Sequence, residues 1–390
     1  MLMKQKQRLM YRIVVASDSF KGSLTSEEVA QNVKAGISRV CPSCKVDTIC
    51  VADGGEGTTE ALCRTLGGEL VEVAVSDPLG RTVRASYALL ADGRTAVMEM
   101  SGASGLPLLK ECERNPLKTS TYGTGELIAD ALKRGCRRFL VGIGGSATND
   151  GGMGMLAALG FRFLDAEGNI LPGIGESLDY VENIDDSEVL PEVWEAVFTV
   201  ACDVDAPLYG PKGAACVFAP QKGADTRTVK VLDDGLRHFS DVLIRCLGKD
   251  VGELPGAGAA GGLGGGFVAF LNATLTPGIE MVLDAIDFDS VISGADLVVT
   301  GEGRIDSQTL GGKTPYGIML RARKQGIKVA AIGGSVGLDE ASARAAGFDF
   351  ICQATPDDMP LETAMLKDVA SANVADAAEK IMNLYIETIK

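Results

Sequence analysis

The sequence predicts an α/β protein in which one parallel five-stranded sheet is interrupted along the chain by an inserted domain. Two observations support this prediction. Short apolar runs rich in Val and Ile alternate with helical patterns near both ends of the chain, as in parallel β-α units. From residue 69 the pattern changes to closely spaced strands joined by tight turns, which is typical of antiparallel hairpins. Such hairpins are not expected within a parallel α/β sheet.

The outer segments supply the expected sheet and its helices. Strands are predicted at 12–17, 45–52, 296–301, 328–334 and 349–355, and helices at 27–38, 57–66 and 362–389. These elements fit a doubly wound sheet with strand order 2-1-3-4-5. We therefore expect a discontinuous, split Rossmann-like domain formed by residues 1–68 and 285–390.

Residues 69–284 are expected to form the inserted α+β domain. Its strands and helices are predicted near 69–75, 82–90, 95–100, 139–143, 153–159, 197–201 and 228–247. The stretch 254–279 has no charged residue, but its many glycines and its two prolines would weaken a membrane-spanning helix. We expect a glycine-rich loop there, followed by a short buried helix.

Composition excludes several classes of protein. A net charge of −15 without any basic run argues against nucleic-acid binding. The ten cysteines are scattered, and the pair Cys41 and Cys44 lacks further zinc ligands, so we expect reduced thiols. The apolar run 11–16 is shorter than the ~7–15 residues of a signal peptide core. We expect a cytoplasmic protein without a membrane partner, in which residues 1–9 are an unstructured extension.

Polar side chains follow the strands that flank the predicted switch point of the sheet, where ligands bind in such folds. After the first strand come Ser17, Asp18, Ser19 and Lys21, and after the third come Glu302, Arg304 and Asp306. Asp53 and Glu56 follow the second strand, where they favour contacts to substrate hydroxyls or to Mg²⁺ over simple helix capping.

Two glycine-rich segments are candidates for holding phosphate. Residues 142–152 lie between a strand and a helix start, an arrangement that binds anions; the alternative is a tight turn capped by Asn149 or Asp150. Residues 255–266 are either a second phosphate site or a flexible hinge. The phosphate-binding candidates in these segments are Gly144, Gly145, Ser146, Thr148, Asn149, Gly258, Gly261 and Gly262.

Asp203 and Asp205 end another strand, so they suit a Mg²⁺ site or a general base as well as a turn before Pro207. Lys212 and Lys222, further on, could steer phosphate or be solvated loop residues, and we favour the solvated loop. His238 is the only histidine and sits in a helical pattern, so a general base must be Asp, Glu or Lys.

At this point the motifs resemble those of the type I glycerate kinases. The matching segments are 17–23, 51–58, 142–152, 255–262, 300–306 and 312–315. The resemblance implies ATP and Mg²⁺ as cofactors, glycerate as substrate and, most often, 2-phosphoglycerate as product. Ala206 and Ala219 depart from the family pattern, which usually has Asn and Gly there.

These expectations assign roles to individual residues. Lys21 and Arg304 should meet the substrate carboxylate or the transferring phosphoryl group, with Lys313 near the phosphates. Asp203 and Asp306 are the candidate bases, and Asp203 and Glu302 the candidate Mg²⁺ ligands. Ser17, Asp18, Ser19, Asp53 and Glu56 are expected to contact substrate.

Three other functions remain open at this stage. Glycerate could be phosphorylated on its 3-hydroxyl. An NAD-linked hydroxy-acid dehydrogenase would suit the sheet, but no GxGxxG follows the first strand. A nucleotide sensor without activity would not require so many acidic groups at strand ends.

Overall fold

The computed structural model describes residues 10–389, so the expected extension at 1–9 lies outside the described residues. The chain forms two compact units. One consists of the residues up to Asp53 and from Val282 onward, and the other of Gly54–Met281. The boundaries expected from sequence were residues 68/69 and 284/285. The first boundary differs because of α2 (Thr58–Leu66). This helix was expected in the first domain, but it packs on strands of the second unit.

The first unit is built on a five-stranded parallel sheet. Its strands, in spatial order, are β13 (Phe350–Gln353), β12 (Lys328–Val336), β11 (Leu297–Ile305), β1 (Arg12–Ser17) and β2 (Lys45–Cys50). Ile13 lies opposite Leu297 on one side and Val46 on the other. The predicted α/β class with a parallel sheet is confirmed.

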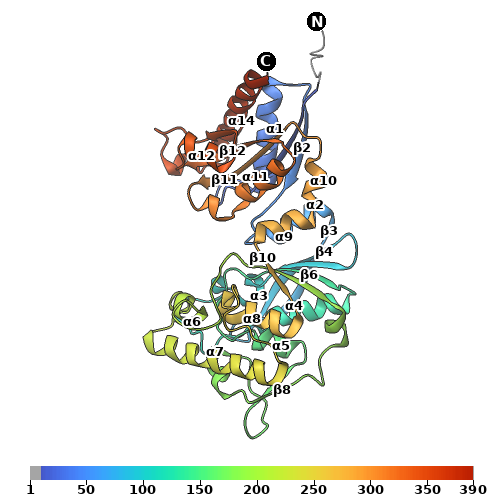
Figure 1. Cartoon of the computed structure of the whole chain (residues 1–390), viewed down its shortest axis with the longest axis vertical. Helices are drawn as coiled ribbons and strands as arrows, with labels where there is room; N and C mark the ends of the chain where they lie inside the picture. The colour runs from blue at the N-terminus through green and yellow to red at the C-terminus, as the bar shows by residue number, and fades with distance from the viewer. Residues whose placement is uncertain (1–9, 390) are drawn as a thin grey trace. The chain divides into compact units, whose positions relative to one another are not determined.

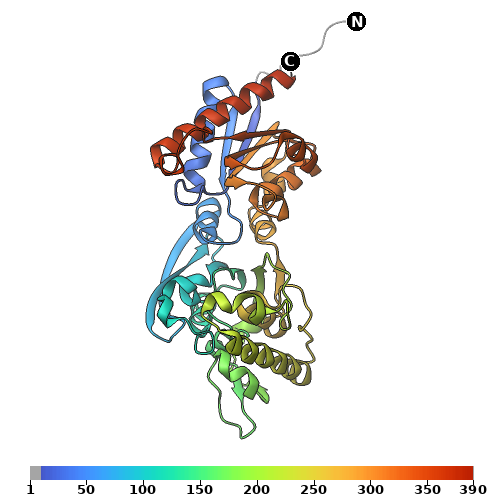
Figure 2. The same ribbon diagram turned by 90° about the vertical axis from the view of Figure 1, so that its left-hand side faces the viewer.

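Helices cover both faces of this sheet (Figure 1). On one face α1 (Ser26–Val40) and α14 (Lys367–Ile389) lie side by side, as the blue and red helices of Figure 2 show. Ile13 and Val15 point toward them, and because side chains alternate along a strand, Val14 points toward α11 (Thr314–Lys324) on the other face. The remaining helices of this unit are α10 (Phe288–Ile292), α12 (Glu340–Ala346) and α13 (Leu361–Ala364). The last predicted helix is thus divided into α13 and α14.

Cys41 and Cys44 form a disulfide, so the expectation that all ten cysteines are reduced thiols is wrong for this pair. Cys41 caps the C-terminus of α1, and Cys44 N donates to Cys41 O at 3.1 Å. This tight turn brings the two Cα atoms within 5.4 Å, a separation at which a disulfide can form. In the described part of the chain the other eight cysteines are outside disulfides.

The second unit contains a six-stranded mixed sheet. Its strands, in spatial order, are β10 (Thr274–Thr276), β9 (Val197–Ala201), β6 (Arg138–Gly142), β5 (Thr95–Glu99), β4 (Thr82–Leu90) and β3 (Gly68–Ser76). The predicted hairpin strands β3, β4 and β5 are present. These antiparallel strands belong to the same sheet as parallel ones, however, because β5 also pairs in parallel with β6.

Helices and a small hairpin complete the second unit. They are α3 (Ser101–Ser104), α4 (Tyr122–Lys133), α5 (Met153–Ala158), β7 (Arg162–Leu164), β8 (Asn183–Asp185), α6 (Ala214–Phe218), α7 (Thr226–Leu247), α8 (Ala259–Leu271) and α9 (Gly278–Ala285), which runs across the boundary. Short 3₁₀ turns occur at Leu106–Leu108, Glu111–Glu113, Gly175–Tyr180, Pro191–Glu195 and Pro220–Lys222 here, and at Thr309–Gly311 in the first unit. The glycine-rich segment does lead into a buried helix, α8. Within residues 10–389, no helix has the length and apolar character needed to cross a membrane.

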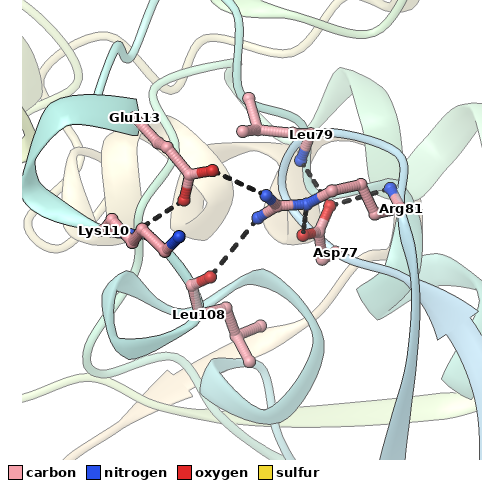
Figure 3. A network of polar contacts seen from close by, with 6 residues as sticks. All are labelled: Asp77, Leu79, Arg81, Leu108, Lys110 and Glu113. Atoms are coloured by element: carbon pink, nitrogen blue, oxygen red, sulfur yellow. Dashed lines mark hydrogen bonds and ion pairs between the residues drawn. The ribbon is translucent and has the colours of Figure 1, made fainter.

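The turn between β3 and β4 is held by a buried carboxylate (Figure 3). Asp77 accepts hydrogen bonds from Leu79 N at 2.8 Å and from Arg81 N at 2.9 Å. The Arg81 guanidinium bridges Asp77 at 2.6 Å and Glu113 at 2.7 Å. One of the tight turns predicted between these strands is thus confirmed. Through Arg81 it also connects the hairpin to the loop that carries Glu113.

The contact between α1 and α14 generates a test of the first unit. A Cβ at Gly36 would lie 2.0 Å from Ala375 O, so Gly36→Val must push α1 and α14 apart. We expect a loss of about 1–3 kcal/mol in the free energy of unfolding, the usual effect of overpacking. Ala35→Val, at the adjacent exposed position, is the matched control. Calorimetry that finds equal melting temperatures for the two variants would contradict the close packing.

Candidate active site

A pocket of about 570 Å³ lies at the carboxyl edge of the five-stranded sheet, entirely within the first unit. The ends of β1 and β11 border it, and the order of the strands reverses between them. Seven residues predicted from sequence line this pocket: Asp18, Ser19, Lys21, Asp53, Glu302, Arg304 and Lys313. The structure therefore brings together side chains from three separate segments of the chain.

The pairing of β1 with β11 positions the first of these groups. Asp18 N donates to Gly301 O at 3.0 Å, and the buried hydroxyl of Ser17 donates to the same carbonyl at 3.0 Å. On the other side of β11, a Cβ at Gly301 would lie 2.4 Å from Ile332 O, so β11 and β12 approach closely here. Ser17 thus joins two strands, a different role from the substrate contact expected of it.

Asp18 is a buried carboxylate with few compensating partners. Ser19 N donates to its Oδ1 at 2.6 Å, and Thr314 Oγ1 donates to its Oδ2 at 3.2 Å. Burial, reinforced by the charge of Asp53, nevertheless raises the pKa of Asp18 to about 6. Asp18 therefore changes its charge closer to neutral pH than an ordinary aspartate does.

Glu302 is the second desolvated acid of the pocket. Burial raises its pKa, against the opposing effects of a hydrogen bond from Thr309 Oγ1 and of the Lys313 ammonium, whose Nζ lies 3.8 Å from Glu302 Oε2. Glu302 is 8% exposed. The 3₁₀ turn Thr309–Gly311 fixes this carboxylate on the floor of the pocket.

The cations are far more exposed than the acids. The side chains of Lys21 and Arg304 are 68% and 74% exposed. Lys21 Nζ lies 4.0 Å from Asp53 Oδ2, and Arg304 Nε lies 3.0 Å from Asp306 Oδ2. These exposed ion pairs are weak, so both cations can turn toward an anion that enters the pocket.

The acids of the pocket fit Mg²⁺ of the kind that phosphoryl transfer uses. Such an ion needs only one or two carboxylates, because water and phosphate oxygens complete its shell. Asp18 and Glu302, whose pKa values are both raised, would gain from added positive charge. No three His, Cys, Asp or Glu side chains of residues 10–389 form a larger metal-binding group. Asp203, the other expected ligand, belongs to the second unit, where its Oδ1 accepts from Gly278 N at 2.9 Å.

Lys222, in the second unit, is buried. It was expected in solvent, but it is 1% exposed, and its Nζ donates to Ser146 Oγ and Thr148 O, both at 2.6 Å. Burial lowers the pKa of Lys222 to about 7. The expectation of a solvated residue is therefore wrong, because the turn Pro220–Lys222 folds this side chain under the first glycine-rich loop.

The two glycine-rich segments pack against each other. Gly151 N donates to Gly261 O at 3.0 Å. A Cβ at Gly261 would lie 2.1 Å from Thr148 O, and one at Gly258 would lie 2.1 Å from Pro207 O. Gly262 likewise faces Gly151, so these glycines allow backbone packing and leave no room there for a ligand.

Only the tip of the first loop is open. Gly144 and Gly145 are exposed, and a Cβ at Gly144 would meet nothing within 4 Å. Thr148 and Asn149 are fully buried, and neither amide atom of Asn149 has a hydrogen-bond partner within the described residues. Asp150 accepts from Gly152 N at 3.1 Å and Gly154 N at 3.2 Å, which is the capping role weighed as an alternative.

Some residues were assigned differently by sequence and by structure. Glu56 is exposed before α2 in the second unit and does not line the pocket. Conversely, no sequence pattern pointed to the apolar lining from Met359, Leu361 and Met365, or to Asn373. Those residues resemble ordinary positions of an amphipathic helix.

Comparisons with known proteins agree on one family. A family model described as the glycerate kinase family matches residues 13–386. A glycerate kinase of Halalkalibacterium halodurans is 47% identical over 371 residues, which cover 94% of this chain and 98% of the relative. The glycerate 2-kinase of Escherichia coli K12 is 45% identical over 340 residues, 87% of this chain and 89% of the relative. A crystal structure provisionally assigned as glycerate kinase 2 of Salmonella typhimurium LT2 matches with a TM-score of 0.89 at 42% identity, covering 97% of this chain and 99% of that chain.

The burial of Asp18 predicts a stability effect with a definite sign. Its folded pKa of about 6 lies above the ordinary 3.8, so the folded state binds the proton more tightly, and stability falls as pH rises from about 4 to 6. Asp18→Asn cannot ionise. It should therefore be more stable than wild type at pH 7.5, by up to about 3 kcal/mol, and the difference should shrink below pH 4.

Denaturation followed across this pH range checks the sign. Asp358→Asn, at an exposed position, is the matched control and should change little. An Asp18→Asn variant that is no more stable than wild type at pH 7.5 would show that the carboxylate is better compensated than its contacts indicate.

Proposed function

Because the chain belongs to the glycerate kinase family, we propose that it transfers the γ-phosphoryl group of ATP to D-glycerate. The products are ADP and 2-phosphoglycerate, a choice supported by the name of the Escherichia coli relative. The observation that carries the proposal is the pocket in which two buried acids, Asp18 and Glu302, share the lining with the more exposed cations Lys21, Arg304 and Lys313. Phosphoryl transfer requires this combination of positioning, a proton acceptor and neutralisation of charge.

The order of the five parallel strands supports interpreting the first unit as a split Rossmann-like domain. In this proposal the sheet is 2-1-3-4-5, where β11, β12 and β13 are the last three strands. The second unit is then the inserted α+β domain, with its boundaries set by the compact units. We also propose that the protein works in the cytoplasm, where the eight cysteines outside the Cys41–Cys44 disulfide would stay reduced.

Asp18 is the group we favour as general base. It accepts the proton of the substrate hydroxyl as the oxygen bonds to the γ-phosphorus and the bond to the ADP oxygen breaks. A raised pKa makes a carboxylate a better base near neutral pH. Of the bases expected from sequence, Asp306 is paired with Arg304, and Asp203 belongs to the second unit.

The remaining groups position the reactants. Lys21 and Arg304 hold the glycerate carboxylate or the transferring group, and Lys313 contacts phosphate. Glu302 would hold Mg²⁺, which supplies positive charge to the phosphate oxygens. In the second unit the open tip Gly144–Gly145 is the part of the glycine-rich segments that offers accessible backbone N–H groups to phosphate.

The activity itself is the first test. Purified protein with Mg²⁺ and ATP should release ADP only when D-glycerate is present, at about 1–100 s⁻¹, and EDTA should abolish the reaction. Phosphorus NMR of the product distinguishes phosphorylation at carbon 2 from that at carbon 3 by coupling to the methine or the methylene protons. ADP release that D-glycerate does not stimulate would refute the proposed reaction.

Lys21→Ala tests the role of the pocket cations. If Lys21 acts on charge that develops during transfer, kcat should fall on the order of 10²-fold. If it grips the glycerate carboxylate equally in both states, KM for glycerate should rise instead. Lys34→Ala, an exposed lysine of α1 outside the pocket, is the matched control. Wild-type kcat and KM in Lys21→Ala would place the reaction elsewhere.

A further inference from the structure

The pocket of the first unit is much larger than a three-carbon acid requires. Its volume of about 570 Å³ lies within the range of sites that enclose drug-sized ligands, about 300–1,000 Å³. Its polar lining comes from the ends of β1, β2 and β11. A second, apolar lining comes from a different part of the chain, the segment after β13 and the start of α14: Ala354, Pro356, Met359, Leu361, Ala364, Met365 and Val374.

We propose that this apolar lining binds the adenine base of ATP. The inference rests on the proposed function, because it assigns a place to the nucleotide of that same reaction. A purine has two apolar faces and a polar edge, so it needs a flat apolar slot with one or two hydrogen-bonding groups. Met359 and Met365 are suited to the faces, because the thioether adapts its shape and makes favourable contacts with aromatic rings.

The local packing places this apolar lining next to the loop after β1, which carries Lys21 and Gly22. The Met365 side chain lies over Gly22, where an added Cβ would come within 2.7 Å of Met365 Cε. Gly22 has φ +81, a conformation that glycine adopts readily, and it directly follows Lys21. A base held at Met365 is thus adjacent to the loop whose cation, Lys21, we assign to the transferred group or the substrate.

Asn373 is the residue that can read the edge of the base. It lies on α14, is half-buried and lines the pocket. Within the described residues its only amide contact is from Nδ2 to Met359 Sδ at 3.5 Å, and a thioether is a weak acceptor. Both its donor and its acceptor therefore remain available, and an Asn amide matches the amino donor and ring-nitrogen acceptor of adenine.

The neighbouring amide in the pocket cannot take this role. Gln353 Oε1 accepts from Val336 N at 2.9 Å, and its Nε2 donates to Thr355 O and Asp357 Oδ1, both at 2.8 Å. Gln353 therefore shapes the loop after β13, and Asn373 is the amide left to select adenine. Guanine presents acceptors at both of the corresponding major-groove-edge positions, so a single Asn amide cannot satisfy it equally well.

The experiment compares Asn373→Ala with Asn383→Ala, an exposed asparagine of the same helix outside the pocket. In Asn373→Ala we expect KM for ATP to rise about 5- to 100-fold and the preference for ATP over GTP to shrink. KM for D-glycerate should be unchanged. Asn383→Ala should match wild type in all three quantities.

A second pair of variants measures binding without turnover. Leu361→Glu adds a negative charge to an exposed position of the apolar lining, and Leu366→Glu adds it to an exposed position outside the pocket. Calorimetric titration with a nonhydrolysable ATP analogue should show affinity at least tenfold weaker for Leu361→Glu than for Leu366→Glu.

The outcomes separate this inference from the proposed function. If wild type phosphorylates D-glycerate but Asn373→Ala and Leu361→Glu keep wild-type affinity for nucleotide and its preference for ATP, the base lies elsewhere and the inference fails. If wild type shows no glycerate-dependent turnover, the proposed function fails. The titrations then still decide whether this pocket binds the nucleotide.

Discussion

The parallel pairing of β1 with β11 is the interaction on which the candidate site depends. It joins distant parts of the chain: Ser17 Oγ donates to Gly301 O, a residue 284 positions further on. The entropic cost of closing so long a loop grows only slowly with its length, and fully buried side chains such as Ile13 and Leu297 offset it. Once the strands pair, both end at the same edge of the sheet, and Asp18 and Glu302 must share one pocket.

That confinement explains the electrostatics of the pocket. Two carboxylates are held where water is scarce, and the cations nearest to them, Lys21 beside Asp18 and Lys313 beside Glu302, are 68% and 40% exposed. The acids are therefore undercompensated in the free protein, which is unfavourable for stability. Under the proposed function, ATP with Mg²⁺ would bring both the positive charge that the acids lack and the negative charge that the exposed cations can bind.

Local patterns in the sequence were sufficient for most strands and helices, because apolar periodicity and turn residues act over short distances. They also placed Asp18, Lys21, Glu302 and Arg304 at strand ends that share one edge. Burial is a long-range property, and the sequence could not reveal it. The residues around Lys222 did not distinguish it from an exposed loop lysine. The sequence of α2 did not indicate which of the two sheets this helix covers. The spacing of Cys41 and Cys44 was apparent, but it did not reveal the disulfide between them.

Glycine shows the same limit most clearly, since it permits both ligand approach and close packing of backbone. In the second unit close packing prevails. Gly261 fits against Thr148 O, and the amine of Lys222 bonds to Thr148 O and Ser146 Oγ from within the protein. These contacts hold the base of the loop in one conformation and leave only Gly144 and Gly145 exposed. Under the proposed function, phosphate that meets this tip would find a loop whose base is already packed, which lowers the cost of ordering the loop on binding.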